Sequence, residues 1–346
     1  MRSAKSKLVA ALLVASLAVP AFAASQAGKP MHNLYGTVPA AEAPAVQAPD
    51  PDADADTAAP QIAPSATPAV IGDINKVPAK QLFGAERLPT QGDPEAYGGY
   101  ALGCMSGARQ LPMTGPTWQV MRPSRNRNWG MPQLLSVIEK LSVEARVKAG
   151  WNGLLVGDIA QPRGGPMLTG HASHQIGLDA DIWFTPMPAR VLSAKERETM
   201  VPLEMVRDHR TLNTDNWSES RARLLMTVAQ NPQVERVFMH PPIKAEMCRW
   251  AQSQPGDHSW LSKLRPLYGH TFHFHVRIRC PAGMTSCKPQ GEPKPKDGTG
   301  CGEELAYWMS GKPFIKPPPP KVPPKPAPPL TMRALPAECR AVIAAP

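Results

Sequence analysis

The sequence lacks the short motifs that mark several large enzyme classes. It has no His-Glu-x-x-His signature, no Gly-x-Ser-x-Gly elbow and no Gly-rich nucleotide-binding loop, which argues against thermolysin-type, elbow-type serine and nucleotide-dependent enzymes. It also has no Cys-x-x-Cys pair. Beyond the N-terminus no apolar run approaches the roughly 20 residues that cross a membrane, so we expect no stable membrane insertion.

The N-terminus has the features of an export signal. Arg2, Lys5 and Lys7 precede an apolar run over residues 8–19, and residues 21–23 form an Ala-x-Ala cleavage site. We therefore predict a signal peptide over residues 1–23, with an uncleaved anchor as the alternative. No Cys follows the cleavage site, which argues against a lipoprotein. The mature chain is expected in the bacterial periplasm.

All six cysteines lie in the mature part of the chain: Cys104, Cys248, Cys280, Cys287, Cys301 and Cys339. An even number in an oxidising compartment predicts three disulfides, although counting leaves their pairing open. Cys280 and Cys287 are closest in sequence and are able to close a small loop. A zinc-binding set of cysteines is the competing interpretation, and the absence of Cys-x-x-Cys argues against it.

The chain is basic. Its formal net charge is +10, and +7 once the signal peptide, with three basic and no acidic residues, is removed. A basic domain suits a polyanionic partner such as a cell-wall polymer or a membrane surface. No aromatic-basic motif supports nucleic acid as the partner. A basic surface without a specific partner stays open, as does the oligomeric state, with a homodimer among the alternatives.

Two segments of biased composition enclose one domain. Residues 24–78 are rich in Ala, Pro and Asp and offer too little apolar surface to offset the entropy of ordering, so we predict a disordered linker. Residues 313–329 contain ten prolines with interspersed Lys, which favours extended polyproline II structure. The domain between them, residues 79–312, is long enough for a sizeable core. A disulfide at Cys339 would tie the C-terminal segment, residues 313–346, back onto it.

Hydrophobic periodicity predicts helices from Pro132 to about Gly150 and over residues 220–229, 244–251 and 303–309. It predicts strands over residues 153–159, 178–184, 234–239 and 273–280, with a Gly- and Pro-rich loop over residues 161–170. The order of these elements is irregular, which favours an α+β domain over a doubly wound sheet. We expect a small, mainly antiparallel sheet with flanking helices and long disulfide-stapled loops.

Five of the nine histidines fall in two short windows, residues 170–181 and 270–275. In the first, His174 ends a Gly-bounded loop, and Asp181 follows seven residues later in a predicted strand. Because strand side chains alternate, Asp179 and Asp181 share one face, and Gly177 allows His174 to fold back over it. An imidazole and a carboxylate that converge in this way are suitable zinc ligands. Asp179 is placed to orient a ligand histidine.

In the second window, His273, His275, Arg277 and Arg279 alternate with apolar residues from Phe272 onward. His275 would complete the set begun in the first window, and three protein ligands leave a fourth position for water, as in catalytic zinc sites. His273 would then act as general base. Arg277 and Arg279 are candidates to bind a substrate carboxylate, although such arginines are more often paired or solvated.

Each window alone is more often a strand surface feature than a metal site. A single His-x-His pair or a single His-to-Asp spacing carries little information. Their coincidence, each beside apolar residues that alternate as in a strand, favours a zinc site.

The two windows closely resemble a known family. The runs Ser173-His174-Gln175-Ile176-Gly177-Leu178-Asp179-Ala180-Asp181-Ile182-Trp183 and His273-Phe274-His275-Val276-Arg277-Ile278-Arg279-Cys280-Pro281 are similar to motifs of the penicillin-insensitive murein endopeptidases. That family belongs to the zinc peptidases that include the lysostaphin-type enzymes and D-alanyl-D-alanine peptidases. The resemblance spans about residues 75–345.

The resemblance implies zinc-dependent hydrolysis of D-alanyl–meso-diaminopimelyl cross-links in peptidoglycan, without inhibition by penicillin. It implies that His174, Asp181 and His275 bind zinc, that His273 is the catalytic base and that His270 lies near the site. It further implies three disulfides, namely Cys104–Cys339, Cys248–Cys301 and Cys280–Cys287.

One part of the family pattern is altered here. His171 matches a histidine sometimes assigned to a second metal, whose other ligands form an Asp-x-x-His. Asp208 matches the Asp, but the His is displaced to His209. We therefore expect a single zinc. A supporting or loop role for His171 is at least as well favoured as a role in binding a second metal. The alternative class is a non-catalytic wall-binding or metal-binding module. The presence of all four ligand and base positions favours the enzyme, and its exact bond preference stays open.

Overall fold

We describe the protein from a computed structural model, which covers residues 73–315 and 328–346 in the detail used below. The predicted signal peptide, almost all of the predicted linker and most of the proline-rich segment lie outside these ranges. Within them, no helix is both long and apolar enough to cross a membrane.

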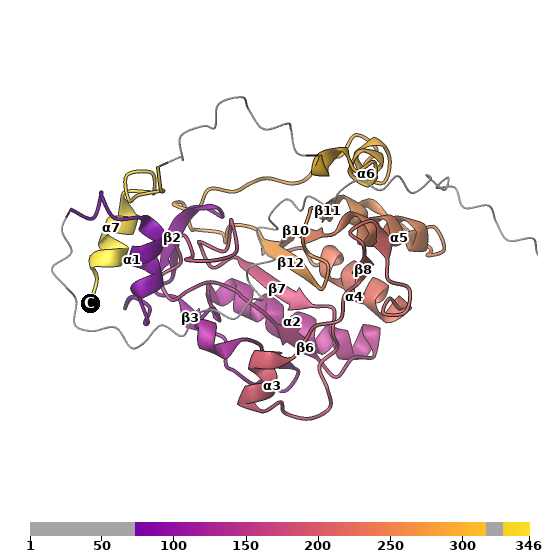
Figure 1. The fold of residues 1–346 in the computed structure, drawn as a ribbon, viewed down its shortest axis with the longest axis horizontal. Helices are drawn as coiled ribbons and strands as arrows, with labels where there is room; N and C mark the ends of the chain where they lie inside the picture. Colours follow the sequence, from indigo (N-terminus) through magenta and orange to yellow (C-terminus); the bar gives the residue numbers. More distant parts are fainter. Residues whose placement is uncertain (1–72, 316–327) are drawn as a thin grey trace, which may run out of the picture. The chain divides into compact units, whose positions relative to one another are not determined.

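One mixed sheet of six strands positions the functional residues. Its strands are β4 (Trp118–Val120), β6 (Leu154–Val156), β7 (Asp179–Trp183), β10 (Val234–Met239), β11 (Leu264–Pro266) and β12 (His273–Ile278). They lie in the order β11-β10-β12-β7-β6-β4, and Figure 1 labels all of them except β4. The three central pairings are antiparallel and the two outer pairings, β10–β11 and β4–β6, are parallel. The predicted α+β class with a mainly antiparallel sheet is confirmed.

Apolar residues of two long helices pack against one face of this sheet. These two are α2 (Pro132–Ala149) and α4 (Glu219–Gln230). The other α-helices of the described ranges are α1 (Ala79–Ala85), α3 (Ala194–Thr199), α5 (Pro241–Ala251), α6 (Glu303–Met309) and α7 (Glu338–Ala344). Leu134 of α2 and Leu224 of α4 share one buried core with Ala180 of β7 and Phe274 of β12. Residues that alternate with these core positions along β7 and β12 therefore project from the opposite face.

The predicted elements agree with the structure in most places. The predicted helix at Pro132 is α2, which ends at Gly150 with a φ of 70°, the left-handed conformation that glycine adopts readily. The third predicted helix, residues 244–251, begins earlier, at Pro241, because proline is tolerated in the first helical turn. The predicted strand over residues 153–159 is shorter in the structure, since β6 covers only Leu154–Val156. Residues 157–159 instead form part of the site described below.

Smaller elements that periodicity did not predict complete the described part. They are α1, α3, α7, the hairpin of β1 (Glu95–Gly99) and β2 (Leu102–Ser106), and the short pairs β3 (Arg109–Gln110) with β5 (Trp129–Gly130) and β8 (Val206–Arg207) with β9 (Thr211–Leu212). Short 3-10 helices lie at Pro123–Arg125, Ser259–Lys263 and Lys312–Phe314.

The C-terminal helix α7 is held against the N-terminal helix α1. The disulfide Cys104–Cys339 joins β2 to α7, and Phe83 of α1 shares a second apolar cluster with Leu335. Arg163 donates hydrogen bonds to three carbonyls at the end of α7, those of residues 342, 343 and 345. The other disulfides are Cys248–Cys301 and Cys280–Cys287, so the pairing is the one that the resemblance implied.

Candidate metal centre

The pairing of β7 with β12 brings the two histidine windows together. His275 lies opposite Asp181 and Arg277 lies opposite Asp179 in the antiparallel register. Paired residues project from the same face of a sheet, so these four side chains lie on the face opposite the core of α2 and α4. The loop after β6 returns along this face and adds His171 and His174.

Backbone conformations that are costly for most residues occur in this loop, at His171 and His174, and in the segment before β12, at His270. His171, His174 and His270 have φ values of 37°, 63° and 50°. Non-glycine residues in this left-handed region are uncommon and cluster at functional sites. Gly177, with a φ of 66°, makes the turn into β7, and a Cβ atom there would lie 2.4 Å from Met105 Sδ. The predicted role of Gly177 is therefore supported by both its φ and the lack of space for a side chain.

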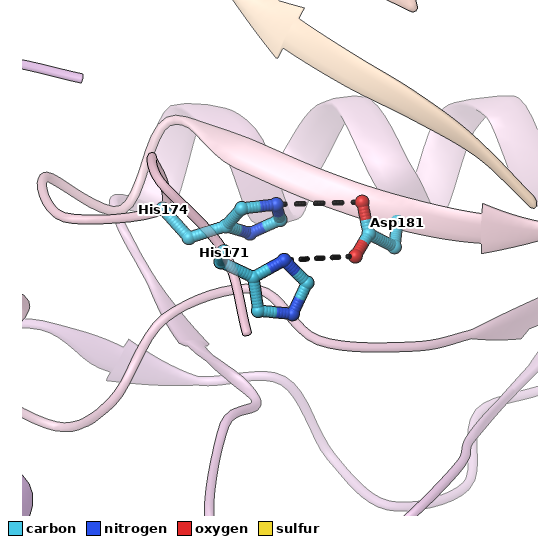
Figure 2. A group of neighbouring side chains, drawn as sticks. All are labelled: His171, His174 and Asp181. Carbon is cyan, nitrogen blue, oxygen red and sulfur yellow. Dashed lines mark ion pairs between the residues drawn. The ribbon is translucent and has the colours of Figure 1, made fainter. Parts of the chain in front are cut away.

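Asp181 lies at the centre of the cluster. Its Oδ1 is 3.3 Å from His174 Nε2 and 3.5 Å from His275 Nδ1, and its Oδ2 is 3.6 Å from His171 Nδ1. His174 Nε2 and His275 Nδ1 are themselves 3.2 Å apart. Figure 2 shows His171 and His174 facing the two oxygens of one carboxylate. His171, His174 and Asp181 form a buried group of the kind that can hold a metal ion, and the His275 distances place a further ligand atom beside it.

The second nitrogen of each imidazole faces an acceptor. His174 Nδ1 faces the carbonyl of Ile159, His275 Nε2 lies 3.0 Å from Asp179 Oδ1, and His171 Nε2 lies 2.9 Å from Asp158 Oδ2. An N–H that donates to these acceptors leaves a lone pair on the other nitrogen, the one directed at Asp181. This is how partners behind metal-binding histidines fix their tautomer and orientation.

The site favours an ionised Asp181 beside a neutral His275. Burial alone would raise the pKa of Asp181, but the neighbouring His174, His273 and His171 hold it well below its usual range. Burial lowers the pKa of His275 to about 4, against the opposing effect of Asp179. Neutral imidazole and ionised carboxylate are the protonation states that bind metal ions.

The residues fit a zinc ion. Asp181 Oδ1 is buried and accepts no hydrogen bond from any residue in the described ranges, although three imidazole nitrogens lie within 3.7 Å of it. Such an uncompensated buried oxygen is rare without a water or ion. Imidazole nitrogen together with carboxylate oxygen is a donor set that zinc prefers.

His273 lies at the edge of the cluster. Its Nε2 is 3.7 Å from Asp181 Oδ1, and its ring lies beside those of His270 and Phe272. A small hollow at the surface is lined by His273 and Asp181 and also by Arg122, Arg125, Trp183 and Phe272. The structure thus brings His270 and His273 to the site. Phe272 packs on Trp183 beside the hollow and not in the main core that contains Phe274.

The remaining predicted residues have other surroundings. Arg277 is buried and pairs with Asp179, at 2.7 Å from its Nε, while Arg279 pairs with Glu292 at the surface. Both arginines are thus paired, which was the alternative to a role in binding substrate. Asp208 is exposed between β8 and β9 and belongs to no potential metal cluster among the described residues.

Asp158 was not predicted, yet it organises one side of the site. Its carboxylate accepts hydrogen bonds from Arg127 at 2.8 Å and from Arg125 at 3.4 Å. The same carboxylate also faces His171. Burial would raise its pKa, but Arg127, His171 and Arg125 keep it ionised with a pKa far below the usual range. The available signal was its position near the end of the predicted buried strand over residues 153–159, where an acidic residue needs partners.

Comparisons with known proteins agree with this geometry. A family model described as penicillin-insensitive murein endopeptidase matches residues 96–344. A penicillin-insensitive murein endopeptidase of Haemophilus influenzae is 42% identical over 242 residues, which cover 67% of this chain and 82% of the relative. The namesake of Yersinia enterocolitica is 40% identical, over 68% of this chain and 85% of the relative.

A third relative gives the same result. The penicillin-insensitive murein endopeptidase of Klebsiella pneumoniae is 39% identical over 70% of this chain and 86% of the relative. The matched region contains both histidine windows and all six cysteines. The chain therefore belongs to the family of penicillin-insensitive murein endopeptidases.

Proposed function

We propose that the chain is a periplasmic, zinc-dependent endopeptidase that hydrolyses D-alanyl–meso-diaminopimelyl cross-links in peptidoglycan. The observation that carries the proposal is the buried Asp181 Oδ1, which lies among three imidazole nitrogens without accepting a hydrogen bond from the described residues. The names of the relatives support the substrate class. The three disulfides fit an oxidising compartment outside the cytoplasm.

In this proposal His174, Asp181 and His275 hold one zinc ion. Both imidazoles are fixed from behind, by the Ile159 carbonyl and by Asp179. His171 faces the other oxygen of Asp181 and is held by Asp158, so it positions the carboxylate. A second zinc is not proposed, because Asp208 is part of no potential metal cluster in the described ranges.

His273 is the proposed general base. It lines a hollow of about 10 Å³ together with Asp181, which is room for about one water molecule, so a water held there meets both groups. Zinc, when bound, supplies the Lewis acidity that activates water and polarises a scissile carbonyl near neutral pH. His273 then takes a proton from the water as the carbonyl is attacked and returns it to the leaving amine. No serine nucleophile is involved, which agrees with insensitivity to acylation by penicillin.

The test is hydrolysis of purified cross-linked muropeptide dimers by the full mature chain. We expect conversion of dimers to monomers, loss of this activity with a chelator and recovery when zinc is added. Unchanged dimers in the presence of zinc would contradict the proposal and would favour a module that binds the cell wall without cleaving it.

A further inference from the structure

A second concave site lies away from the metal centre. It is a groove of about 850 Å³ whose floor is formed by Arg236 of β10 and Arg265 of β11. Its walls come from residues 292–297 and from residues 302–304 at the start of α6. None of the proposed zinc ligands lines it. We call it the accessory groove.

The accessory groove lies on the same face of the sheet as the metal centre. Arg236 is paired with Arg277, and Phe238 is paired with His275 on one side and with Arg265 on the other. Paired residues project from one face, so Arg236 and Arg265 point to the side of His275. Adjacent strands are about 4.8 Å apart, so the strand of Arg236 lies about 5 Å from that of His275, and the strand of Arg265 lies roughly 10 Å from it.

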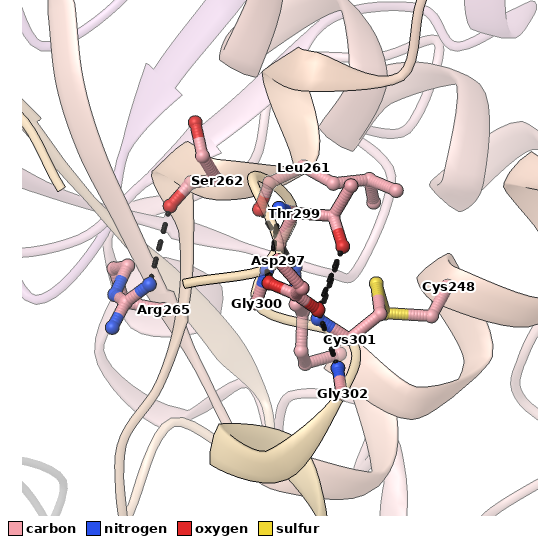
Figure 3. The surroundings of a disulfide bond; sticks show 10 residues. Cys248, Leu261, Ser262, Arg265, Asp297, Thr299, Gly300, Cys301 and Gly302 are labelled. Carbon is pink, nitrogen blue, oxygen red and sulfur yellow. Dashed lines mark hydrogen bonds between the residues drawn. A yellow bond between two sulfur atoms is a disulfide. The ribbon is translucent and has the colours of Figure 1, made fainter. Parts of the chain in front are cut away.

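The wall of the groove is anchored at several points before any ligand binds. The Asp297 carboxylate accepts hydrogen bonds from the backbone N–H groups of residues 299, 300 and 302, and the disulfide Cys248–Cys301 fixes the same turn to α5 (Figure 3). Behind it, the buried Lys244 Nζ donates to the carbonyls of Leu261 and Thr299. A preformed wall reduces the entropy lost when a ligand binds.

The groove is lined by four basic and four acidic side chains, so its formal charge is zero, but each acidic side chain already has a partner. The anions are engaged: Glu304 pairs with Arg265, Glu303 with Lys296 at 3.8 Å, Glu292 with Arg279, and Asp297 with backbone N–H groups. These four residues are all the acidic residues that line the groove.

Two cations of the lining have no such partner. Lys294 is exposed and makes no ion pair with any residue in the described ranges, and Arg236 donates to the Gly291 carbonyl but has a buried Nε without an acceptor. A guanidinium and an ammonium in one groove suit a carboxylate ligand.

We propose that the accessory groove binds a carboxylate-bearing peptide stem of the substrate polymer, with Arg236 and Lys294 as its anion-binding residues. The inference rests on the proposed function, since the stem peptides of cross-linked peptidoglycan offer carboxylates in quantity. A polymer held here raises the local concentration of its other peptides at the metal centre. The groove therefore increases affinity for intact, multivalent cell wall.

The experiment measures co-sedimentation of chelator-treated full-length protein with purified insoluble peptidoglycan sacculi, so that no cleavage occurs. Lys294→Glu reverses an exposed charge in the groove, and Lys140→Glu makes the same change at an exposed position of α2. We expect Lys294→Glu to weaken binding about fivefold, a difference near 1 kcal/mol, and Lys140→Glu to bind as the wild type does. Arg236→Gln, checked for an unchanged melting temperature, should weaken binding similarly.

A second arm tests the chemistry of the ligand. In this arm the carboxylates of the sacculi are converted to amides. The wild type should bind these sacculi as weakly as the Lys294→Glu variant binds unmodified sacculi. The proposal would be overturned if Lys294→Glu bound sacculi as tightly as the wild type does. It would also be overturned if Lys294→Glu and Lys140→Glu lost the same amount of affinity for sacculi. Hydrolysis of soluble dimers by the zinc-loaded wild type is measured separately, so a failure of the proposed enzymatic function is distinguished from a failure of the groove.

Discussion

Asp179 Oδ1 lies 3.0 Å from His275 Nε2, on the side of the imidazole that faces away from Asp181. The same carboxylate is held by Arg277, whose Nε is 2.7 Å away and whose guanidinium lies 4.1 Å from the centre of the Tyr100 ring. Burial would raise the pKa of Asp179, but Arg277 and His275 keep it far below its usual range. Asp179 is therefore an ionised acceptor that fixes the orientation of His275.

The first prediction concerns this contact. Asp179→Asn keeps the size of the side chain but removes its charge, so His275 is oriented less firmly and is a weaker ligand. We expect zinc affinity to fall about 10- to 100-fold, measured by competition with a chromophoric chelator. Asp93→Asn, at an exposed position, is the control. Equal affinities for wild type and Asp179→Asn would show that the contact has no role in metal binding.

The second prediction separates binding of metal from catalysis. His273→Ala should retain zinc, because His273 is not a proposed ligand, and should lose about 10²- to 10⁴-fold in the rate of dimer hydrolysis. His258→Ala, whose ring contacts the Gln254 carbonyl away from the site, is the matched control for loss of an imidazole. Full activity of His273→Ala would refute its role as base, and loss of zinc would make it a ligand instead.

The third prediction concerns the disulfides. Cys104–Cys339 spans 235 residues, whereas Cys280–Cys287 spans 7. In the chain-entropy model the longer link restricts the unfolded chain more, by about 3 kcal/mol. Replacing both cysteines of the long link with Ser should therefore lower the free energy of unfolding more than the same change in the short link. Denaturant titrations of the two double variants measure the difference, and the reverse order would contradict this account.

Lys244 gives the structure a distinct dependence on pH. The pKa of its amine is lowered from 10.5 to about 7, mainly by burial and also by the positive charge of Arg265. The carboxylates of Glu304 and Asp297 act in the opposite direction and raise it. The unfolded chain therefore binds more protons than the folded chain between about pH 7 and 10.5, and stability rises with pH in that window.

The fourth prediction follows from this sign. The free energy of unfolding of the wild type should rise relative to that of Lys244→Met as the pH increases from 7 to 10, by at most about 1.4 kcal/mol per pH unit. The difference between the two proteins isolates this amine from other titrating groups. Parallel pH profiles would show that the amine keeps its ordinary pKa.

The sequence was sufficient to predict the elements whose side chains repeat with a clear period. The helix from Pro132 and the strand carrying His273 and His275 have continuous apolar faces, and both occur as expected. Strand alternation also placed Asp179 and Asp181 on one face. Those inferences depend only on local geometry.

Other parts of the site depend on contacts between segments far apart in the chain. Asp158 is recognisable as a site residue only once Arg127 and His171 surround it. Likewise, the pairing of Arg277 with Asp179 requires the register between β7 and β12, which no local pattern specifies. The two-residue strands and the helix α7, held by Cys339 and Arg163, are too short to have a period.

The most direct test of the account is the zinc content of purified variants after dialysis, measured by atomic emission. We predict about one zinc per chain in the wild type and in His171→Ala, and almost none in His174→Ala, Asp181→Ala and His275→Ala. Circular dichroism of each variant shows whether it has folded. Full zinc content in His275→Ala together with its loss in His171→Ala would contradict the proposed ligand set.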